Sequence, residues 1–423
     1  MDGERLLTAI DVGTTKVCTI IAKVQGDKKV DVLGTGIVPS QGLRKGNVVD
    51  IESTQYAVRA SIEDASAQAG VKVSSAYVGV TGSHVVSGNQ WGSVEATKNS
   101  TVITPTDIDR VKDSLYESEG SQDREVIHVL PRYYSLDGMI GIRNPIGMHA
   151  QNLQVQSHTI TGASSIIKNL VQAVENVDVK VLGMVLEPLA SGEAVLTQEE
   201  REMGVVLVDI GGGTSDMAVF HDGTILHTAV IPVGGYQFTN DISMSFDTPY
   251  FAAEEAKLKY GHVNVESIDI NEEIEIPLFG KDGTISIPRR DLCLLLKERA
   301  RELLEMVKIK LDQANLTNVR ENRLVLTGGS ANLPGLEDMA RRILTSHVRL
   351  GVPRDILGLT DRLKNPSYAT SVGILLWYAQ NPEGRPYHAN GNVKNGHMAF
   401  YQRLLNWVFK RPKATAPVLA STE

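Results

Sequence analysis

The sequence predicts an α/β protein of two lobes, in which two similar αβ halves with mixed sheets face each other. The first observation behind this is a repeated pattern: a buried strand ending in aspartate, a turn rich in glycine and threonine, and two further strands. The copies are Leu6–Val24 with Val30–Val38, and Val205–Phe220 with Thr224–Val233. The second observation is a stretch of different character near residues 84–160, which predicts a module inserted in the first half.

The composition indicates a large globular protein and argues against some classes of binding partner. The chain has 423 residues, of which 42% are hydrophobic and 22% charged, so it can bury more than one core. A net charge of −8 and 5% aromatic residues argue against a nucleic-acid partner. Cys18 and Cys293 have no CxxC spacing, which favours buried thiols in a reducing cytoplasm. The amino terminus shows no signal-peptide pattern, and no run reaches the roughly 18 apolar residues that span a bilayer.

The first half predicts helices and strands on either side of the inserted module. Glu52–Gly70 has amphipathic spacing and ends in glycine, and Ser75–Val80 is predicted to be a short buried strand. The module itself is expected to contain one helix and three strands: Thr106–Leu115, then Val85–Ser87, Glu125–Tyr134 and Asn152–Ile160. Helical spacing resumes at Ser164–Val174, and an apolar run follows at Val181–Pro188.

The second half repeats this plan around a more acidic insertion. Beyond Gly234–Ser243 lies an acidic segment that extends to Gly280, and its carboxylates are typical of a solvated surface. The segments after it predict a long helix, a strand that runs into a glycine turn, and a helix of small residues: Arg289–Leu311, Glu321–Gly328 and Ser367–Ala379. Two such halves, joined by small-residue helices, would enclose a central cleft.

The two aspartate hairpins have the residue types of a phosphate clamp. Glycine lets backbone N–H groups approach an anion closely, and a pair of carboxylates can hold a hydrated Mg²⁺. A single hairpin of this kind could equally be an ordinary one whose glycines merely turn the chain. The repetition, with Asp11 and Asp209 at matching places, favours the clamp.

Five segments in a fixed order resemble the nucleotide-binding motifs of the actin, DnaK and sugar-kinase superfamily. They are DVGTTK (Asp11–Lys16), EPLASG (Glu187–Gly192), VDIGGGTSD (Val208–Asp216), LTGGSANLPG (Leu326–Gly335) and NPSYATSVG (Asn365–Gly373). In the superfamily these are the phosphate-one, connect-one, phosphate-two, adenosine and connect-two motifs. The resemblance implies an actin-like fold that binds ATP and Mg²⁺ in its cleft.

Residue roles follow from matching these motifs. The resemblance places Asp11 and Asp209 near Mg²⁺, through water. It assigns the β- and γ-phosphates to two facing sets of residues: Gly13, Thr14, Thr15 and Lys16, and Gly211, Gly212, Gly213 and Thr214. For Lys16, a solvated turn residue remains the alternative. The α-phosphate and adenosine would be approached by Gly328, Gly329, Ser330 and Asn332.

Two glutamates complete the set of candidates. Glu298–Leu304 resembles the helix edge that contacts ribose and adenine in relatives, and Glu302 is the residue chosen from it. Glu187 occupies the place where relatives hold a group close to the attacking water, although capping of the adjacent backbone would also explain it. A catalytic base must lie in line with the γ-phosphate, which a sequence cannot show. No catalytic residue is therefore assigned, and at most slow ATP hydrolysis is expected.

Within that superfamily, the chain most resembles the FtsA family of bacterial cell-division proteins. The module near residues 84–160 lies where that family carries its extra 1C subdomain, and Gly42–Thr54 through Ala76–Val85 resembles the family's approach to 1C. The implied division of the body is a first lobe (1–83 and 161–193), a 1C-type subdomain (84–160), a second-lobe core (194–235 and 301–360), a second-lobe insertion (236–300) and a connect-two helix (361–380).

The carboxyl-terminal segment is predicted to bind membranes. Residues 381–396 are rich in glycine, asparagine and proline, which is typical of a flexible linker, and residues 414–423 are expected to be a disordered tail. Between them, residues 397–413 have helical periodicity, with an apolar arc opposite a polar, basic one, as in helices that lie in the bilayer interface. A last helix packed on the protein's own core is the alternative. The predicted membrane-binding residues are Met398, Phe400, Tyr401, Leu404, Leu405, Trp407, Val408, Phe409, Arg403, Lys410 and Arg411.

The FtsA resemblance implies a function in cell division. An ATP-binding, actin-like protein would polymerise on the cytoplasmic face of the cell membrane at the division site. It would bind anionic lipids through its terminal helix and tether the tubulin-like protein FtsZ, with other division proteins as further partners. One alternative is an adaptor like PilM of type IV pilus assembly, which shares the inserted subdomain. Another is a small-molecule kinase of the same superfamily, but the sequence offers no substrate-side carboxylate for one.

Overall fold

The computed structural model describes residues 4–26, 28–95, 102–121, 123–280, 283–316 and 323–381. Contacts divide the chain into two compact units, Met1–Arg385 and Pro386–Glu423, and every described residue belongs to the first. The predicted membrane helix, and the linker beyond residue 381, lie outside the described residues. Within the described part of the chain, no helix is both long and apolar enough to cross a bilayer.

The first lobe is built on a five-stranded mixed sheet. Its strands, in spatial order, are β11 (Lys180–Leu186), β6 (Ser75–Val80), β1 (Arg5–Val12), β2 (Lys16–Val24) and β3 (Val30–Pro39). The first three strands in the chain form an antiparallel meander, whereas β6 runs parallel to β1 and β11 runs parallel to β6. β1 and β2 are buried along most of their length, as expected for strands covered on both faces.

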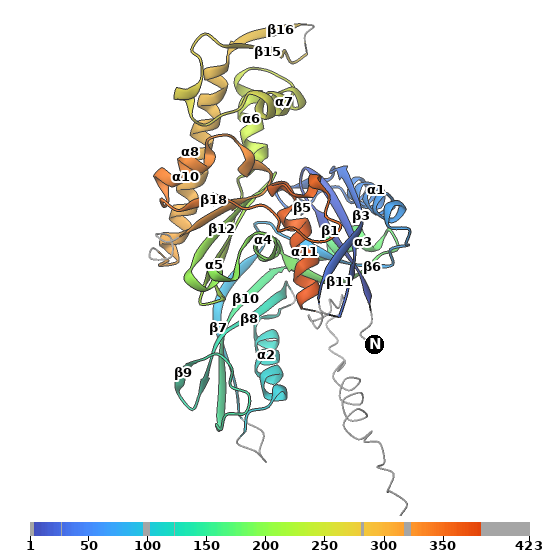
Figure 1. The fold of residues 1–423 in the computed structure, drawn as a ribbon, viewed down its shortest axis with the longest axis vertical. Helices are drawn as coiled ribbons and strands as arrows, with labels where there is room; N and C mark the ends of the chain where they lie inside the picture. The colour runs from blue at the N-terminus through green and yellow to red at the C-terminus, as the bar shows by residue number, and fades with distance from the viewer. Residues whose placement is uncertain are drawn as a thin grey trace, which may run out of the picture. The chain divides into compact units, whose positions relative to one another are not determined.

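The second lobe repeats this sheet. Its strands, in spatial order, are β14 (Thr224–Ile231), β13 (Ser215–His221), β12 (Val205–Ile210), β17 (Leu324–Thr327) and β18 (Val348–Leu350). Here too the first three strands in the chain are antiparallel, and the next two are added in parallel on the other side of the first strand. The predicted duplication of mixed-sheet αβ halves is therefore confirmed (Figure 1).

Two helices, both with small residues at their start, pack between the sheets. α4 (Glu187–Val195) and α11 (Ala369–Gln380) are almost wholly buried, and they approach so closely that a Cβ on Gly373 would overlap the carbonyl oxygen of Ala190. Their apolar side chains share one core with Ile20 of the first sheet and with Leu207 and Phe220 of the second. The two lobes therefore meet through a continuous apolar core.

Further helices cover the outer faces of the two sheets. α1 (Ile51–Ala69) and α3 (Ser164–Glu175) contact the first sheet, and α6 (Gly235–Ser245), α8 (Arg289–Gln313) and α10 (Leu336–Ile343) form a core with the second. A short helix, α5 (Gln198–Met203), precedes β12. α1 is capped at its start by Asp50, whose side chain accepts the Ser53 N–H, and at its end by Gly70, whose φ of 66° suits glycine.

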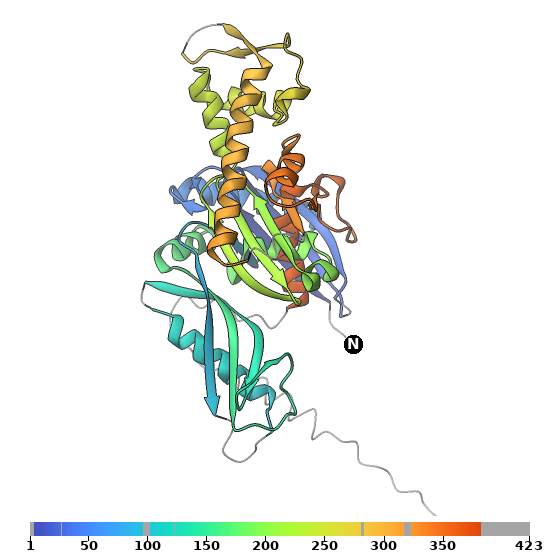
Figure 2. The same ribbon diagram turned by 90° about the vertical axis from the view of Figure 1, so that its left-hand side faces the viewer.

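The second-lobe insertion contains α7 (Tyr250–Tyr260) and a hairpin of β15 (Glu273–Pro277) and β16 (Thr284–Pro288). Figure 2 shows α8 as one long helix that runs from this hairpin along the sheet of the second lobe. The predicted boundary between residues 300 and 301 therefore falls inside a helix and needs correction. The reason is that Leu296, Ala300 and Leu303 are all buried in the same core.

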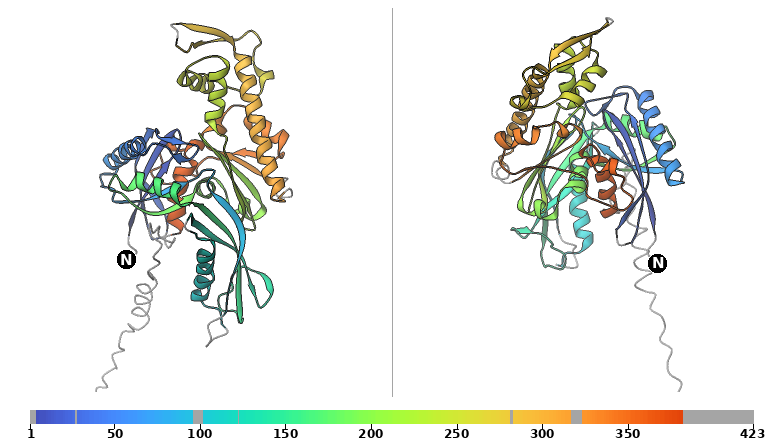
Figure 3. Two further views of the ribbon diagram at one scale, coloured as in Figure 1. Left: turned by 180° about the vertical axis from the view of Figure 1, so that it is seen from behind. Right: turned by 45° about the horizontal axis from the view of Figure 1, so that its top comes forward.

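The inserted subdomain has its own sheet and core. The sheet is antiparallel in the order β7 (Val86–Glu95), β10 (Asn152–Ala163), β8 (Arg124–Leu136) and β9 (Met139–Ile142), and α2 (Pro105–Glu119) packs on it (Figure 3). Val111 and Leu115 of α2 meet Leu153 and Val155 of β10 in the core. β7 is much longer than the predicted strand Val85–Ser87, because it pairs with β10 along its whole length although most of its residues are polar or glycine.

Side chains of the inserted subdomain hold the edge strand of the second lobe. Ser87 Oγ and Asn89 Nδ2, both on β7, donate to the carbonyl oxygens of Thr228 and Leu226 on β14, at 3.0 and 3.3 Å. His158 of β10 places Nε2 3.0 Å from Thr228 Oγ1 and Nδ1 2.9 Å from Asn89 Oδ1. The subdomain is therefore bonded to the lobe in which its sequence is not inserted.

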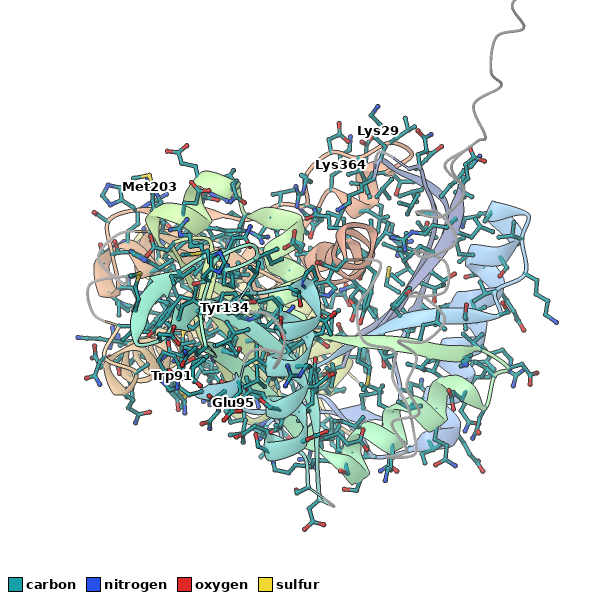
Figure 4. All side chains as sticks on the ribbon, turned by 90° about the horizontal axis from the view of Figure 1, so that it is seen from below. Lys29, Trp91, Glu95, Tyr134, Met203 and Lys364 are labelled. Carbon is teal, nitrogen blue, oxygen red and sulfur yellow. The ribbon has the colours of Figure 1, made fainter. Side chains whose placement is uncertain are left out.

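The same subdomain also contacts the first lobe. The Leu186 N–H at the end of β11 donates to His128 Nε2 on β8 at 3.1 Å, and the His128 ring lies 5.5 Å from that of Trp377 on α11. Trp91 of β7, which is labelled in Figure 4, is in contrast 47% exposed. Its ring meets that of Tyr133 edge-on, with ring centroids 5.7 Å apart. The buried histidines thus mark the contacts of the subdomain with the body.

Candidate functional site

A cleft of about 390 Å³ is lined by residues of both lobes. One wall is the turn from Asp11 to Lys16, and the other contains Asp209 and the turn 211–214. Glu187 lines the cleft as well, together with the predicted adenosine-site residues Gly328, Gly329, Ser330 and Asn332. The structure thus brings together all but one of the residues predicted for a nucleotide site.

The two aspartate hairpins have the same turn and face each other. The Gly13 N–H donates to the Lys16 carbonyl at 3.0 Å, and the Gly211 N–H donates to the Thr214 carbonyl at 2.9 Å. A Cβ on Gly212 would lie 2.5 Å from Cγ2 of Thr15, so the tips of the turns are in close contact. Side chains at these glycines would fill the space between the hairpins and block the approach of an anion to the backbone N–H groups.

Asp11 is buried at the end of β1 and held by one hydroxyl. Ser371 Oγ on α11 donates to Asp11 Oδ2 at 2.6 Å. Burial raises the pKa of Asp11, while the positive charge of Lys16 and the Ser371 bond lower it. Lys16 itself lines the cleft, and its Nζ lies 4.8 Å from the centroid of the Tyr368 ring.

Asp209 is the matching residue at the end of β12, and two hydroxyls hold it. Ser191 on α4 and Thr370 on α11 both donate to Asp209 Oδ2, the latter at 2.9 Å. Burial raises the pKa of Asp209, and these two hydrogen bonds oppose that shift. The helices that join the lobes therefore also orient both aspartates of the cleft.

A third buried acid, Asp216, was not among the predicted site residues. It lies on β13 directly opposite Asp209, and it accepts bonds from Thr81 and from Thr214 Oγ1, the latter at 2.9 Å. Burial raises the pKa of Asp216 to about 7, the Thr81 bond lowers it, and the nearby charge of Asp209 raises it. The available signal was the final aspartate of the VDIGGGTSD motif, which the antiparallel register places beside the first one.

Glu187 occupies the first position of α4 and faces these aspartates. Burial raises its pKa well above the usual range, and the negative charges of Asp11, Asp216 and Asp209 raise it further, in that order. Because these carboxyl groups repel one another when they are ionised, the cleft favours the binding of a positive charge. A hydrated divalent cation or a proton would supply that charge.

Among the described residues, no group of three or more His, Cys, Asp or Glu side chains is arranged to hold a metal ion directly. Asp11 and Asp209 line one cleft, and each is oriented through its Oδ2 oxygen by hydroxyl donors. This arrangement fits a cation held through water molecules better than one enclosed by protein ligands.

The second-lobe wall of the cleft comes from α6 and α7 instead of the predicted edge of α8. Glu254 and Lys257 of α7 form an ion pair at 2.7 Å, and both bond to Thr239 of α6. Glu302, the predicted residue, does not line the cleft. It lies on an exposed part of α8 and pairs with Arg299, which is itself held by Asp241 at 2.6 Å.

The loop after β17 forms the floor between these walls. Gly328 has a φ of 87°, and a Cβ there would overlap Asp209 Oδ1, so glycine is required. Ser330 Oγ donates to the Gly211 carbonyl at 3.1 Å, which ties this loop to the second hairpin. Asn332 Nδ2 donates to the Gly329 carbonyl at 3.2 Å and closes the turn.

Family models match several parts of the chain. The model for cell division protein FtsA matches residues 206–373, in the second lobe and α11. The model for the SHS2 domain inserted in FtsA matches residues 82–161, the inserted subdomain. A model for ethanolamine utilisation protein EutA matches residues 156–249.

Whole-chain relatives and solved structures extend the comparison. Cell division protein FtsA of Pseudomonas aeruginosa is 36% identical over 408 residues, which cover 96% of this chain and 97% of the relative. FtsA of Escherichia coli K12 is 35% identical over 398 residues, with 92% and 93% covered. The PilM–PilN type IV pilus biogenesis complex has a TM-score of 0.62 at 14% identity, with 88% and 98% covered. MreB5 of Spiroplasma citri bound to ADP has a TM-score of 0.53 at 13% identity, with 90% and 99% covered.

The duplicated sheets, the central cleft and these structural neighbours define the class of protein: the chain has the actin-like fold. The predicted fold class is confirmed. With 36% identity to an FtsA protein over nearly the whole chain, this protein belongs to the FtsA family of cell-division proteins. Its inserted subdomain is the SHS2 domain of that family.

Proposed function

We propose that this protein binds Mg·ATP in the cleft, polymerises like actin on the cytoplasmic face of the cell membrane, and tethers the FtsZ ring there through its C-terminal amphipathic helix. The observation that carries the nucleotide part is the pair of matched aspartate–glycine hairpins facing each other across one cleft. Membership of the FtsA family supplies the context of cell division.

The cleft suits a nucleotide by space and by charge. The turns 13–16 and 211–214 would hold the β- and γ-phosphates, and Asp11 and Asp209 would hold Mg²⁺ through water. The loop 328–332 and the Glu254–Lys257 pair would line the adenosine part. A bound magnesium ion supplies positive charge that neutralises phosphate oxygens. MreB5 of Spiroplasma citri, which shares this fold, was solved with ADP bound.

Binding is expected to matter more than turnover. The raised pKa of Glu187 shifts this residue towards its protonated form, which is a poor acceptor for a proton from water. Slow hydrolysis would let ATP act mainly as a ligand that favours one closed arrangement of the lobes, the arrangement that polymerises.

The membrane part rests on the sequence pattern of residues 397–413, which lie outside the described residues. Each basic residue near an anionic leaflet contributes about 1 kcal/mol, so one helix of this kind binds reversibly. A filament that displays many such helices would bind far more firmly through multivalency. Membrane binding and self-association would therefore reinforce each other.

The pilus-adaptor alternative has one observation in its favour, the likeness of fold to the PilM–PilN complex with a TM-score of 0.62. The chain is 36% identical to an FtsA relative but only 14% identical to that complex, which favours a role in cell division over one in pilus assembly. The amphipathic sequence pattern of residues 397–413 also favours a membrane tether over a small-molecule kinase.

The test is co-sedimentation of the full chain with anionic liposomes, with and without ATP and purified FtsZ. FtsZ is expected in the pellet only when the full chain is present, and neutral liposomes should retain much less protein. A variant lacking Gly396–Glu423 is expected to stay in the supernatant while its ATP affinity stays unchanged. Sedimentation of that variant would refute the membrane helix, and FtsZ left behind by liposome-bound full chain would refute the tether.

A further inference from the structure

A small hairpin outside the five nucleotide-binding motifs reaches the phosphate end of the cleft. It consists of β4 (Leu43–Arg44) and β5 (Asn47–Val48), joined by a turn of Lys45 and Gly46. Both turn residues have positive φ, 50° and 77°, as a two-residue type I′ turn requires. Glycine adopts this conformation freely, but for lysine it is strained, and such strain gathers at functional sites.

The hairpin is fixed to both walls of the clamp. At its base, the Ser40 N–H donates to the Thr15 carbonyl of the first hairpin at 3.1 Å. At its tip, a Cβ on Gly213 of the second hairpin would lie 3.0 Å from Cα of Lys45 and 2.7 Å from Oγ1 of Thr14. Lys45 therefore sits beside the point where the two phosphate turns meet, and Gly46 lines the cleft itself.

The charge of the cleft calls for a cation at this place. Among the described residues that line it, four are acids and two are lysines: Asp11, Glu187, Asp209, Glu254, Lys16 and Lys257. Lys257 is already paired with Glu254 at 2.7 Å, on the adenosine side. Mg·ATP brings a net negative charge into this acidic cleft, and its γ-phosphate carries the outermost part of that charge.

We propose that the β4–β5 hairpin is a third arm of the phosphate clamp, and that Lys45 binds the γ-phosphate and so discriminates ATP from ADP. Its flexible four-carbon side chain is exposed, and a bound polyphosphate would draw the ammonium group over Gly213. The inference rests on the proposed nucleotide function and adds to it the residue that senses the terminal phosphate.

The position of the hairpin connects the γ-phosphate site with the inserted subdomain. A Cβ on Gly46 would lie 3.0 Å from both Cα of Gly82 and the carbonyl oxygen of Thr81, so the tip packs on the root of the inserted subdomain. Thr81 in turn donates to Asp216 beside the second hairpin. Ordering of Lys45 on a γ-phosphate would therefore be felt where that subdomain leaves the first lobe.

The test compares the affinities for AMPPNP and ADP, each with Mg²⁺, by calorimetry on the full chain. Lys45→Ala is expected to weaken AMPPNP binding about tenfold, the size of one charge-assisted hydrogen bond, and ADP binding less than threefold. Lys45→Arg should restore most of the loss. The matched control is Lys72→Ala, an exposed lysine elsewhere in the chain, which should change both affinities less than threefold.

Two outcomes separate this inference from the function on which it rests. An unaltered chain that binds neither nucleotide would overturn both. An unaltered chain that binds, with the same AMPPNP-to-ADP ratio in Lys45→Ala, would overturn the role of Lys45 alone. A second measurement needs no variant: Mg·AMPPNP, but not Mg·ADP, should protect Lys45 from acylation by a lysine-reactive ester, measured by mass spectrometry. Equal acylation in the two complexes would also overturn the proposal.

Discussion

The aspartates of the cleft are held by hydroxyl groups that come from the central helices. Ser371 donates to Asp11, and Ser191 and Thr370 donate to Asp209. An ionised carboxylate only accepts hydrogen bonds, so these donors favour the charged form that burial disfavours. The same helices carry the packing between the lobes, which links the orientation of the two acids to the position of the lobes.

Replacing one of these acids should remove the cation without unfolding the protein. Asp209→Ala is expected to weaken Mg·ATP binding about 10- to 100-fold, as the loss of an outer-shell metal partner does. The fold should persist because Ser191 Oγ and Thr370 Oγ1 already lie 3.0 Å apart and can bond to each other. Calorimetric titration measures the affinity, with the exposed Asp64→Ala as control. Unchanged affinity in Asp209→Ala would count against the clamp.

At the residue scale, the sequence predicted the hairpin residues but not their partners. Glycine, threonine and aspartate in a short turn indicate their chemistry locally. The local sequence does not reveal the roles of Asp216 and of the hydroxyl donors. Those roles depend on contacts between residues far apart in the chain, such as Ser371 and Asp11. The register of β12 and β13 pairs Asp209 with Asp216, and that pairing appears only once the hairpin is folded.

At the scale of elements, the proposed adenosine wall is formed by α7, whereas the sequence pattern pointed to the edge of α8 at Glu298–Leu304. Glu254–Lys257 on α7 and Glu298–Arg301 on α8 have the same charge spacing, and both are ion pairs in the structure. Tertiary contacts decide between them. Arg299 is held by Asp241 of α6, so this part of α8 packs along the second lobe, while α7 lines the cleft.

This difference between the helices gives a paired test. Glu254→Gln is expected to weaken ATP binding about tenfold, because it removes the charge that positions Lys257 at the cleft wall. Glu302→Gln should change the affinity less than twofold, because that side chain does not line the cleft. Fluorescence titration with a ribose-labelled ATP analogue would measure both. A larger loss of ATP affinity in Glu302→Gln than in Glu254→Gln would indicate that α8, and not α7, contacts adenosine.

At the scale of the whole molecule, buried histidines join the inserted subdomain to the body and make its stability depend on pH. Burial lowers the pKa of His128 to about 4 and that of His158 to about 3. The unfolded chain titrates near 6.5, so below that pH it binds protons that the folded form does not. Stability is therefore full above about pH 6.5 and falls as the pH drops towards the folded values.

The double variant His128→Gln/His158→Gln should flatten this dependence. At about pH 5.5, each neutral buried histidine costs about 1.4 kcal/mol of stability relative to neutral pH. Thermal unfolding of the variant should therefore change less between pH 7.5 and 5.5 than that of the unaltered chain. The exposed His149→Gln serves as control. An equal change in the double variant would exclude these two residues as the cause.

The way the inserted subdomain holds β14 has a mechanical consequence. Its chain leaves and re-enters the first lobe, yet Ser87, Asn89 and His158 bond to the outer strand of the second. Rotation of one lobe against the other must therefore stretch these three bonds, worth about 0.5–1.5 kcal/mol each, or carry the subdomain along. Because the inserted subdomain is attached to both lobes, a small change of the angle between the lobes would displace the end of the subdomain that lies farthest from them.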